Sequence, residues 1–375
     1  MGTLEEGARN AVEICMSVTD GEHVLILTDR STLEVGQAIA KAAEKVTAGN
    51  VKLQVLEDYV ERPATKLPEA IAKEIPWANV TFLALEGKPG ELAMRMPFVR
   101  TALKYARHAH MPDITRELME IGMCADYVRI SELTKKVEAV VKNARRARVV
   151  NPSGTELEVE FHPSWRWTVD DGLLHQKGMW GNLPAGEIFT AAYKANGKMV
   201  IDELGDWFTP KYGYLKDTPV TLMVKDSRAD LSSVSCANED LRRELVEYLS
   251  TDSNSSRLGE FAIGTNIFLT RLTGNMLQDE KFPSVHCAFG NPLHEETGAD
   301  WESKTHVDGL MLKSSIWIDG HKIMEREASH RLGRLKRTLE RLDVAETLAP
   351  GRYDLASCFG VKYRGGAALA FCYKE

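Results

Sequence analysis

Three strand-length segments near the N-terminus, separated by segments with helical patterns, constrain the fold of this chain more than any other feature. The first (23–28) and third (80–85) are almost continuously apolar, as is typical of strands buried on both faces, and the second (51–56) alternates. Helices are expected at 31–46 and 67–75. Because strand and helix alternate, we expect an α/β domain with a doubly wound parallel sheet.

The turn after the first of these strands argues against a dinucleotide cofactor. It reads Thr28-Asp29-Arg30-Ser31, without the GxGxxG sequence that brings a dinucleotide pyrophosphate against a helix N-terminus. A helix expected at 134–147 closes the domain. We therefore predict a Rossmann-like α/β domain over residues 1–148 that has no dinucleotide fingerprint.

Beyond residue 148 the pattern changes to short strand-like segments with few helices. Pro152-Ser153-Gly154 and Asp319-Gly320 are turn sequences typical of hairpins. We predict that residues 149–375 form a mixed α+β domain with a mostly antiparallel sheet. Its expected strands are 148–150, 157–161, 198–203, 220–224, 261–268, 284–289, 309–312, 315–318 and 321–325, and its expected helices are 239–250 and 326–342.

Composition and charge exclude several classes of protein. The net charge of −7 and the pI of about 5.9 lack the basic excess of nucleic-acid-binding proteins, so we expect no nucleic-acid partner. No apolar run approaches the ~18 residues of a membrane span, and the N-terminus does not have the pattern of a signal peptide. The six cysteines form no CxxC pair, which fits reduced thiols, so we expect a cytoplasmic protein without a membrane partner.

Carboxylates and imidazoles recur inside apolar, strand-like segments of the second domain. In a strand, His306 and Asp308 point to the same face about 6.6–7 Å apart, so both can reach one ion. Glu187, Glu260 and His286 have similar surroundings, where an ionised group is rare unless it is paired or binds a cation. Each residue alone is more often structural, but the set suits one or two transition-metal ions, with Glu260 or Asp308 able to bridge a pair.

Two histidines of the first domain, His108 and His110, stand two residues apart ahead of Pro112. Their position suggests the end of a strand or a loop, and such places often face the ligand-binding crevice of an α/β domain. The alternative is that both imidazoles lie on the surface.

Five motifs follow one another in the part of the chain from about residue 150 to 320: Asn182–Thr190, Gly259–Asn266, Asp279–Lys281, Val285–Gly290 and His306–Asp308. As an ordered set they resemble the thermophilic metalloaminopeptidase family, also called the aminopeptidase T family. The resemblance implies a cytoplasmic homodimer whose site holds two divalent ions of the zinc, cobalt or manganese type. It places the metal ligands at Glu187, Glu260, His286, His306 and Asp308.

The resemblance also implies a reaction. In that family a metal-activated water removes the N-terminal residue of a short peptide, and a site glutamate, Glu187 or Glu260, would act as the general base. One departure is that the segment after His286, Gly290–His294, contains no Tyr where the family usually has one at the metal site. His294 is the candidate to take its place, although an imidazole is not a phenol.

A resemblance to a related branch of the same superfamily implies a different reaction as the alternative. The chain resembles in general plan the 2,5-dihydroxypyridine 5,6-dioxygenases, which hold one Fe(II) by a His, an Asp and a third ligand. That resemblance implies a small aromatic substrate bound to the iron, with His108 or His110 as the acid or base. The presence of Glu187 and His286 favours the hydrolase. A third class, a binding protein with a degenerate site, is disfavoured by the intact ligand set.

Overall fold

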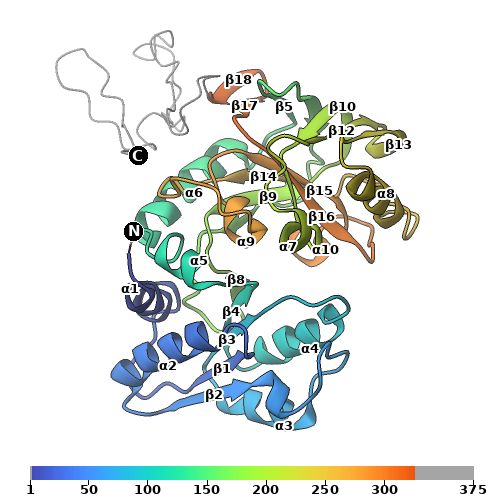
Figure 1. Ribbon diagram of the computed structural model, residues 1–375. Coiled ribbons are helices and arrows are strands. Elements are labelled where there is room, and N and C mark those ends of the chain that lie inside the picture. Colours follow the sequence, from blue (N-terminus) through green and yellow to red (C-terminus); the bar gives the residue numbers. More distant parts are fainter. Residues whose placement is uncertain (1, 326–375) are drawn as a thin grey trace, which may run out of the picture. The chain divides into compact units, whose positions relative to one another are not determined.

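The computed structural model describes residues 2–325, so the helix expected at 326–342 lies outside the described residues. The described chain divides into two compact units, whose helices and strands are drawn in Figure 1. The sequence suggested one boundary, after residue 148. In the structure the chain passes between the units three times: the first unit contains residues 2–131 and 170–186, and the second contains 132–169 and 187–325.

The first unit is built on a five-stranded sheet in which all neighbouring strands pair in parallel. In spatial order its strands are β2 (Val51–Val55), β1 (Val24–Thr28), β3 (Val80–Leu85), β4 (Arg107–Pro112) and β8 (Trp180–Asn182). Every residue of β1 and of β3 is buried, as their apolar sequences predicted. The expectation of a parallel sheet is confirmed.

Helices precede, separate and follow these strands, in the expected alternation. They are α1 (Leu4–Arg9) with its π-helical continuation η1 (Asn10–Cys15), η2 (Leu56–Asp58), α2 (Leu33–Thr47), α3 (Glu69–Glu74), η3 (Ile75–Trp77), α4 (Leu92–Ala102) and α5 (Arg116–Glu120). Helix α2 packs against β1 and β2, and α4 packs against β4. A capping box starts α1, because the Thr3 hydroxyl accepts a hydrogen bond from Glu6 N while Thr3 N donates to the Glu6 carboxylate.

The helix expected at 134–147 is shifted toward the N-terminus. Helix α6 (Tyr127–Val141) ends earlier, and strand β5 (Arg146–Val150) begins where the helix was expected to continue. In β5 the arginines Arg146 and Arg148 are exposed, whereas Ala147 and Val149 between them are buried. This alternation has the period of a strand, so the helix expected to reach residue 147 is wrong at its C-terminal end.

The two histidines of the first unit are buried inside the sheet, so the alternative of surface imidazoles is wrong. Both lie on β4, where His108 is 0% and His110 is 8% exposed. His108 Nδ1 lies 2.8 Å from Thr81 Oγ1, and His110 Nδ1 lies 3.1 Å from Asn182 Oδ1. Burial, together with the charge of Arg95, lowers the pKa of His110 to about 3, so this imidazole is neutral at pH 7.

A buried ion-pair network joins the carboxyl ends of β1 and β3. In α/β sheets with this strand order, the chain reverses its winding direction between these two strands, and ligands often bind there. Here the Arg62 guanidinium, 3% exposed, pairs with Asp29 and Glu91, whose side chains are 0% exposed, and donates to Glu86 O at 2.5 Å. Asp29 also accepts hydrogen bonds from the backbone and hydroxyl of Thr32. The chain's own charges therefore satisfy this polar edge.

The second unit contains two antiparallel sheets, where the sequence indicated one. The pairing is antiparallel throughout the first sheet and from β11 to β9 in the second. The seven-stranded sheet runs β13 (Arg228–Ser235), β12 (Val220–Lys225), β10 (Lys194–Ile201), β6 (Glu156–Glu160), β5, β17 (Ser315–Ile318) and β18 (His321–Met324). The six-stranded sheet runs β11 (Glu203–Leu204), β16 (His306–Met311), β15 (Val285–Gly290), β14 (Glu260–Gly264), β9 (Glu187–Ala191) and β7 (Thr168–Asp170).

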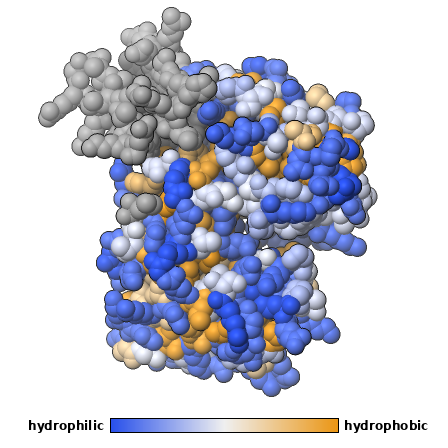
Figure 2. All heavy atoms as spheres, in the orientation of Figure 1, coloured by the Kyte–Doolittle hydropathy of each residue, from blue (hydrophilic) through white to orange (hydrophobic). Residues whose placement is uncertain are grey.

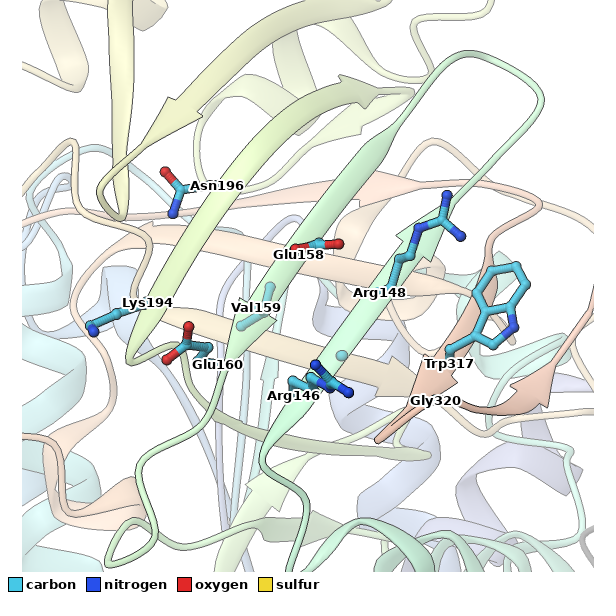
Figure 3. A pocket seen from close by; sticks show the side chains of 10 residues that line it. Arg146, Arg148, Glu158, Val159, Glu160, Lys194, Asn196, Trp317 and Gly320 are labelled. Carbon is cyan, nitrogen blue, oxygen red and sulfur yellow. The ribbon is translucent and has the colours of Figure 1, made fainter.

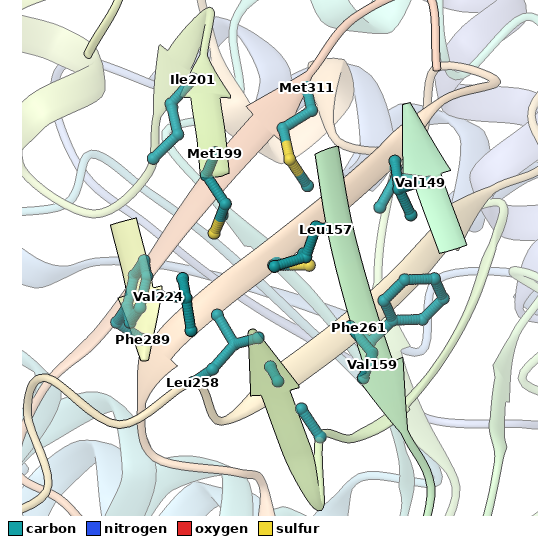
Figure 4. Packing of buried hydrophobic residues seen from close by; sticks show 14 of the residues in the cluster. Val149, Leu157, Val159, Met199, Ile201, Val224, Leu258, Phe261, Phe289 and Met311 are labelled. Carbon is teal, nitrogen blue, oxygen red and sulfur yellow. The ribbon is translucent and has the colours of Figure 1, made fainter. Parts of the chain in front are cut away.

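One hydrophobic cluster draws side chains from both of these sheets. Figure 4 shows Leu157 and Val159 of β6 and Met199 of β10 packed together with Phe261 of β14 and Phe289 of β15. Because strand side chains alternate, the residues between these core positions project from the opposite face of each sheet. The remaining helices of this unit are α7 (Phe208–Tyr212), α8 (Glu239–Tyr248), α9 (Met276–Asp279) and α10 (His294–Thr297).

Hydrophilic side chains cover much of the face shown in Figure 2, in line with the 27% of charged residues in the sequence. Within residues 2–325, none of the helices combines the length and the apolar character that crossing a bilayer requires.

The Arg62 network allows a test of the first unit. We expect Arg62→Met to lower the free energy of unfolding by about 3–5 kcal/mol, because it leaves two buried carboxylates without their counter-charge. Arg30→Met is the matched control, since the exposed pair of Arg30 with Asp58 contributes about 1 kcal/mol or less. Urea unfolding followed by circular dichroism measures both changes. Equal effects of the two substitutions would contradict the assigned role of Arg62.

Candidate metal centre

One face of the six-stranded sheet carries all five residues that were predicted as metal ligands. Glu187 begins β9, Glu260 begins β14, His286 lies on β15, and His306 and Asp308 lie two residues apart on β16. Strand alternation turns their neighbours in sequence to the other face. Those neighbours belong to the hydrophobic cluster between the sheets and are Ile188, Phe261, Val285, Cys287 and Val307.

The five side chains converge into two groups that share Glu260. Ligand atoms of Glu187, Glu260 and His286 lie within 4.8 Å of one another, and so do those of Glu260, His306 and Asp308. Glu260 Oε1 lies 3.5 Å from His286 Nε2, and Glu260 Oε2 lies 3.5 Å from His306 Nε2. One carboxylate thus presents one oxygen to each group, which is how a carboxylate bridges two ions.

The spacing of the donor atoms fits divalent ions. A tetrahedral ion with bonds of about 2.1 Å keeps its ligand atoms about 3.4 Å apart. In the first group His286 Nε2 lies 3.2 Å from Glu187 Oε2, and in the second His306 Nε2 lies 3.5 Å from Asp308 Oδ1. Glu187 Oε2 is also buried without a hydrogen-bond partner in the described chain, as expected of an atom that serves as a ligand. Both groups therefore suit a metal cofactor.

Small residues on the ligand face make room for the centre. Ala262 stands opposite His286 in the strand register, and Ala288 stands opposite Asp308. Gly264 pairs with Glu187, and a Cβ on this glycine would lie only 2.1 Å from the carbonyl oxygen of Phe282. Glycine is therefore required where the segment after α9 crosses the end of β14.

The imidazole of His306 is held in an orientation that suits a ligand. His306 Nδ1 lies 2.8 Å from the carbonyl oxygen of Asn291, to which it donates. This bond places the proton on Nδ1 and leaves Nε2 for an ion, the usual support of a metal-binding histidine. His286 Nδ1 is buried and has no hydrogen-bond partner within residues 2–325.

The electrostatics of the centre show how strongly it favours positive charge. Burial lowers the pKa of His306, but the charge of Asp308 and that of Glu260 outweigh it and raise the pKa to about 10. For His286, the hydrogen bond to Glu260 and the charge of Glu187 outweigh burial and raise the pKa to about 9. Burial raises the pKa of Asp308, but the charge of His306 prevails and lowers it to about 2. A metal ion would displace the imidazole protons and take over their charge.

The sequence interpretation missed two further residues of the centre, Glu280 and Lys281, which directly follow α9. Glu280 forms a third group of ligand atoms within 4.8 Å, together with His286 and Asp308. Lys281 Nζ lies 2.5 Å from Glu187 Oε1 and 2.6 Å from Glu280 Oε1. Burial raises the pKa of Glu280 to about 8, against the opposing charge of Lys281. The available signal was the motif Asp279–Lys281, which belongs to the ordered set that carries the resemblance.

The segment that lacks the expected Tyr provides no phenol, and His294 does not replace one. His294 begins α10, where its side chain is 36% exposed and lies 3.4 Å from Glu302, and it belongs to none of the three ligand groups. A phenol of α8 contacts the backbone of one candidate ligand. Tyr248 Oη lies 3.2 Å from His306 O and 3.3 Å from His306 N, and it donates a short hydrogen bond to Asp206. Tyr248 thus holds the backbone of a candidate ligand.

His110, which the dioxygenase resemblance made a candidate acid or base, belongs to the first unit, whereas all the groups above belong to the second. His108 Nε2 and His110 Nε2 are both buried without a hydrogen-bond partner in the described part of the chain. The role of His110 stays a prediction.

A pocket of about 360 Å³ lies elsewhere in the second unit, on the outer face of the seven-stranded sheet (Figure 3). None of the candidate ligands lines it. Its charged side chains are explained by the sheet itself, because Arg146 stands opposite Glu160 and Arg148 opposite Glu158 in the register of β5 and β6. The pocket and the five candidate ligands are therefore separate features of this unit.

Known proteins resemble part of this chain in sequence and most of it in fold. Residues 119–234 match the family model described as 2,5-dihydroxypyridine 5,6-dioxygenase. No curated protein matches the chain. Among solved structures, 2,5-dihydroxypyridine dioxygenase from Pseudomonas putida KT2440 has a TM-score of 0.64 and 15% identity, covering 87% of this chain and 97% of that one. Wild-type AmpT from Thermus thermophilus has a TM-score of 0.63 and 17% identity, covering 88% of this chain and 98% of that one.

At these identities the two structures establish the fold, and the matched family model covers a part of the chain that contains Glu187 but not the other four candidate ligands. The superfamily resemblance indicated by the motifs is thus confirmed, and the chain has the fold that 2,5-dihydroxypyridine dioxygenase shares with aminopeptidase T.

Proposed function

We propose that this protein is a metal-dependent hydrolase that removes N-terminal residues from short peptides at a centre of two divalent ions of the zinc, cobalt or manganese type. The observation that carries the proposal is the second ligand group. Glu187, Glu260 and His286 stand beside Glu260, His306 and Asp308 with one carboxylate in common. An enzyme that used a single ion would have no need of a second buried group of donors at this spacing.

The position of each candidate ligand suggests its role in binding the two ions. Glu260 would bridge the two positions, Glu187 and His286 would complete one of them, and His306 and Asp308 the other. Bound ions would polarise the scissile carbonyl and acidify a water molecule. The Nδ1 bond of His306 to Asn291 keeps that ring in place during the reaction. The general base, predicted to be Glu187 or Glu260, would also have to carry a proton to the leaving amine.

One observation favours a second candidate, a dioxygenase with one Fe(II). The family model that matches residues 119–234 is that of the 2,5-dihydroxypyridine 5,6-dioxygenases. In this alternative Glu260, His306 and Asp308 alone would hold the iron and leave positions open for oxygen and a dihydroxypyridine. The homodimer, the cytoplasmic location and the role of His110 stay predictions in either case.

Metal content and substrate together test the proposal. We expect the purified protein to bind two zinc, cobalt or manganese ions per chain and to hydrolyse an aminoacyl chromogenic amide. Chelation of the ions should abolish this activity, and their return should restore it. Metal analysis and the release of the chromophore are the measurements. One bound iron, with oxygen uptake on 2,5-dihydroxypyridine and no amide hydrolysis, would instead establish the alternative.

Glu187→Gln separates the two candidates within one protein. The amide keeps the shape of the side chain but removes its charge, so we expect the bound ions to fall from two to one and hydrolysis to fall more than about 100-fold. A site with one iron, built from Glu260, His306 and Asp308, should keep its ion and its activity. Glu158→Gln, which changes an exposed glutamate on the other sheet, is the matched control and should change neither quantity.

A further inference from the structure

Lys281 is a fully buried ammonium that lies among the candidate ligands. Its side chain is 0% exposed, and Nζ forms ion pairs with Glu187 Oε1 at 2.5 Å and with Glu280 Oε1 at 2.6 Å. A charged amine is tolerated in such a place only when carboxylates surround it. The carboxylates that pair with Lys281 are also candidate ligands of a metal ion.

Because of the contact with Lys281, the two carboxylate oxygens of Glu187 have different partners. Oε1 is taken by the ammonium, whereas Oε2 lies 3.2 Å from His286 Nε2 and has no hydrogen-bond partner in the described residues. Glu187 can therefore offer only one oxygen to an ion. Its negative charge is also partly neutralised before any ion arrives.

The backbone of Lys281 is held beside Glu187 by its own hydrogen bonds. Lys281 O accepts a hydrogen bond from Asn266 N at 3.0 Å, and Lys281 N donates one to Gln278 O at 3.0 Å. Its carbonyl oxygen also lies 2.8 Å from the place that a Cβ on Gly264 would occupy. Since Gly264 stands opposite Glu187, the sheet register itself brings Lys281 to that carboxylate.

The two ion pairs of Lys281 described above involve one of the proposed metal positions more than the other. Glu187 belongs to the group with His286, and Glu280 belongs to the group with His286 and Asp308, whereas the group of Glu260, His306 and Asp308 contains neither partner. Because Nζ lies 2.5 Å from a Glu187 oxygen, the ammonium repels a dication bound by Glu187 at short range, where charge repulsion is strong.

We propose that Lys281 makes the two metal positions unequal. The position of Glu260, His306 and Asp308 binds its ion first and tightly, and the position of Glu187, Glu260 and His286 binds the second ion weakly. Lys281 is a positioning residue that competes with the second ion for Glu187. Because hydrolysis as proposed above requires both ions, the concentration of free metal would then set the active fraction. This inference rests on the proposed two-ion centre.

Titration of the chelator-stripped protein with Co²⁺ tests the inference, with calorimetry for affinity and the visible absorption of bound cobalt for coordination. In the wild type we expect a second ion that binds at least about tenfold more weakly than the first. In Lys281→Met we expect the second ion to bind at least about tenfold more tightly, with the first changed by less than about threefold. Lys211→Met, which removes an exposed ammonium paired with Glu244, is the matched control and should leave both affinities unchanged.

The design stays decisive if Lys281→Met does not fold, which circular dichroism will show. The double variant Lys281→Met/Glu280→Gln also removes the charge of one of the two carboxylates that would lose their partner, and it should show the same gain for the second ion. Two ions of equal affinity in the wild type, or a folded variant whose second ion binds no more tightly, would overturn the inference. A different result would contradict the proposed function. If cobalt binds with two unequal affinities but no aminoacyl amide is hydrolysed, the protein is not a peptidase, and the proposed role of Lys281 still holds.

Discussion

Charged side chains can be buried together only when opposite charges lie among them, and the candidate metal centre is organised by this requirement. Glu187, Glu260 and Asp308 are each at most 9% exposed, in surroundings where an unpaired carboxylate would be very costly. Two imidazoles and one ammonium supply positive charge, and the raised pKa values of His286 and His306 show how strongly the carboxylates demand it. A divalent ion meets the same demand with a better fit to the donor atoms, which lie 3.2–3.5 Å apart.

The period-two geometry of strands allows one sheet to hold a dry core and a charged centre on opposite faces. On β15, His286 faces the ligands while Val285 and Cys287 face the core, and on β16 Asp308 is likewise preceded by the buried Val307. A register shift of one residue would exchange the two faces and bury carboxylates in the hydrophobic cluster. The same contacts that stabilise the second unit therefore also set the positions of its ligands.

Buried carboxylates are paired differently in the two units. In the first unit Arg62 satisfies Asp29 and Glu91 at the carboxyl ends of the parallel strands, the region where many α/β proteins bind a ligand. In the second unit Glu187 Oε2 remains without a hydrogen-bond partner among the described residues, although it is buried. A polar atom in that condition is more readily explained by a ligand than by stability.

Local sequence patterns by themselves determined the parallel sheet of the first unit, the hairpins of the second and the five candidate ligands. Apolar runs and alternation report which residues a strand buries, and charged residues inside such runs stand out. Only the tertiary structure decided that residues 170–186 return to the first unit, that His108 and His110 are buried, and that the second unit has two sheets. It alone joined Lys281 to Glu187, which lies 94 residues away in the chain. Such contacts depend on strand register and on a close approach at Gly264, and neither leaves a periodic signal in the sequence.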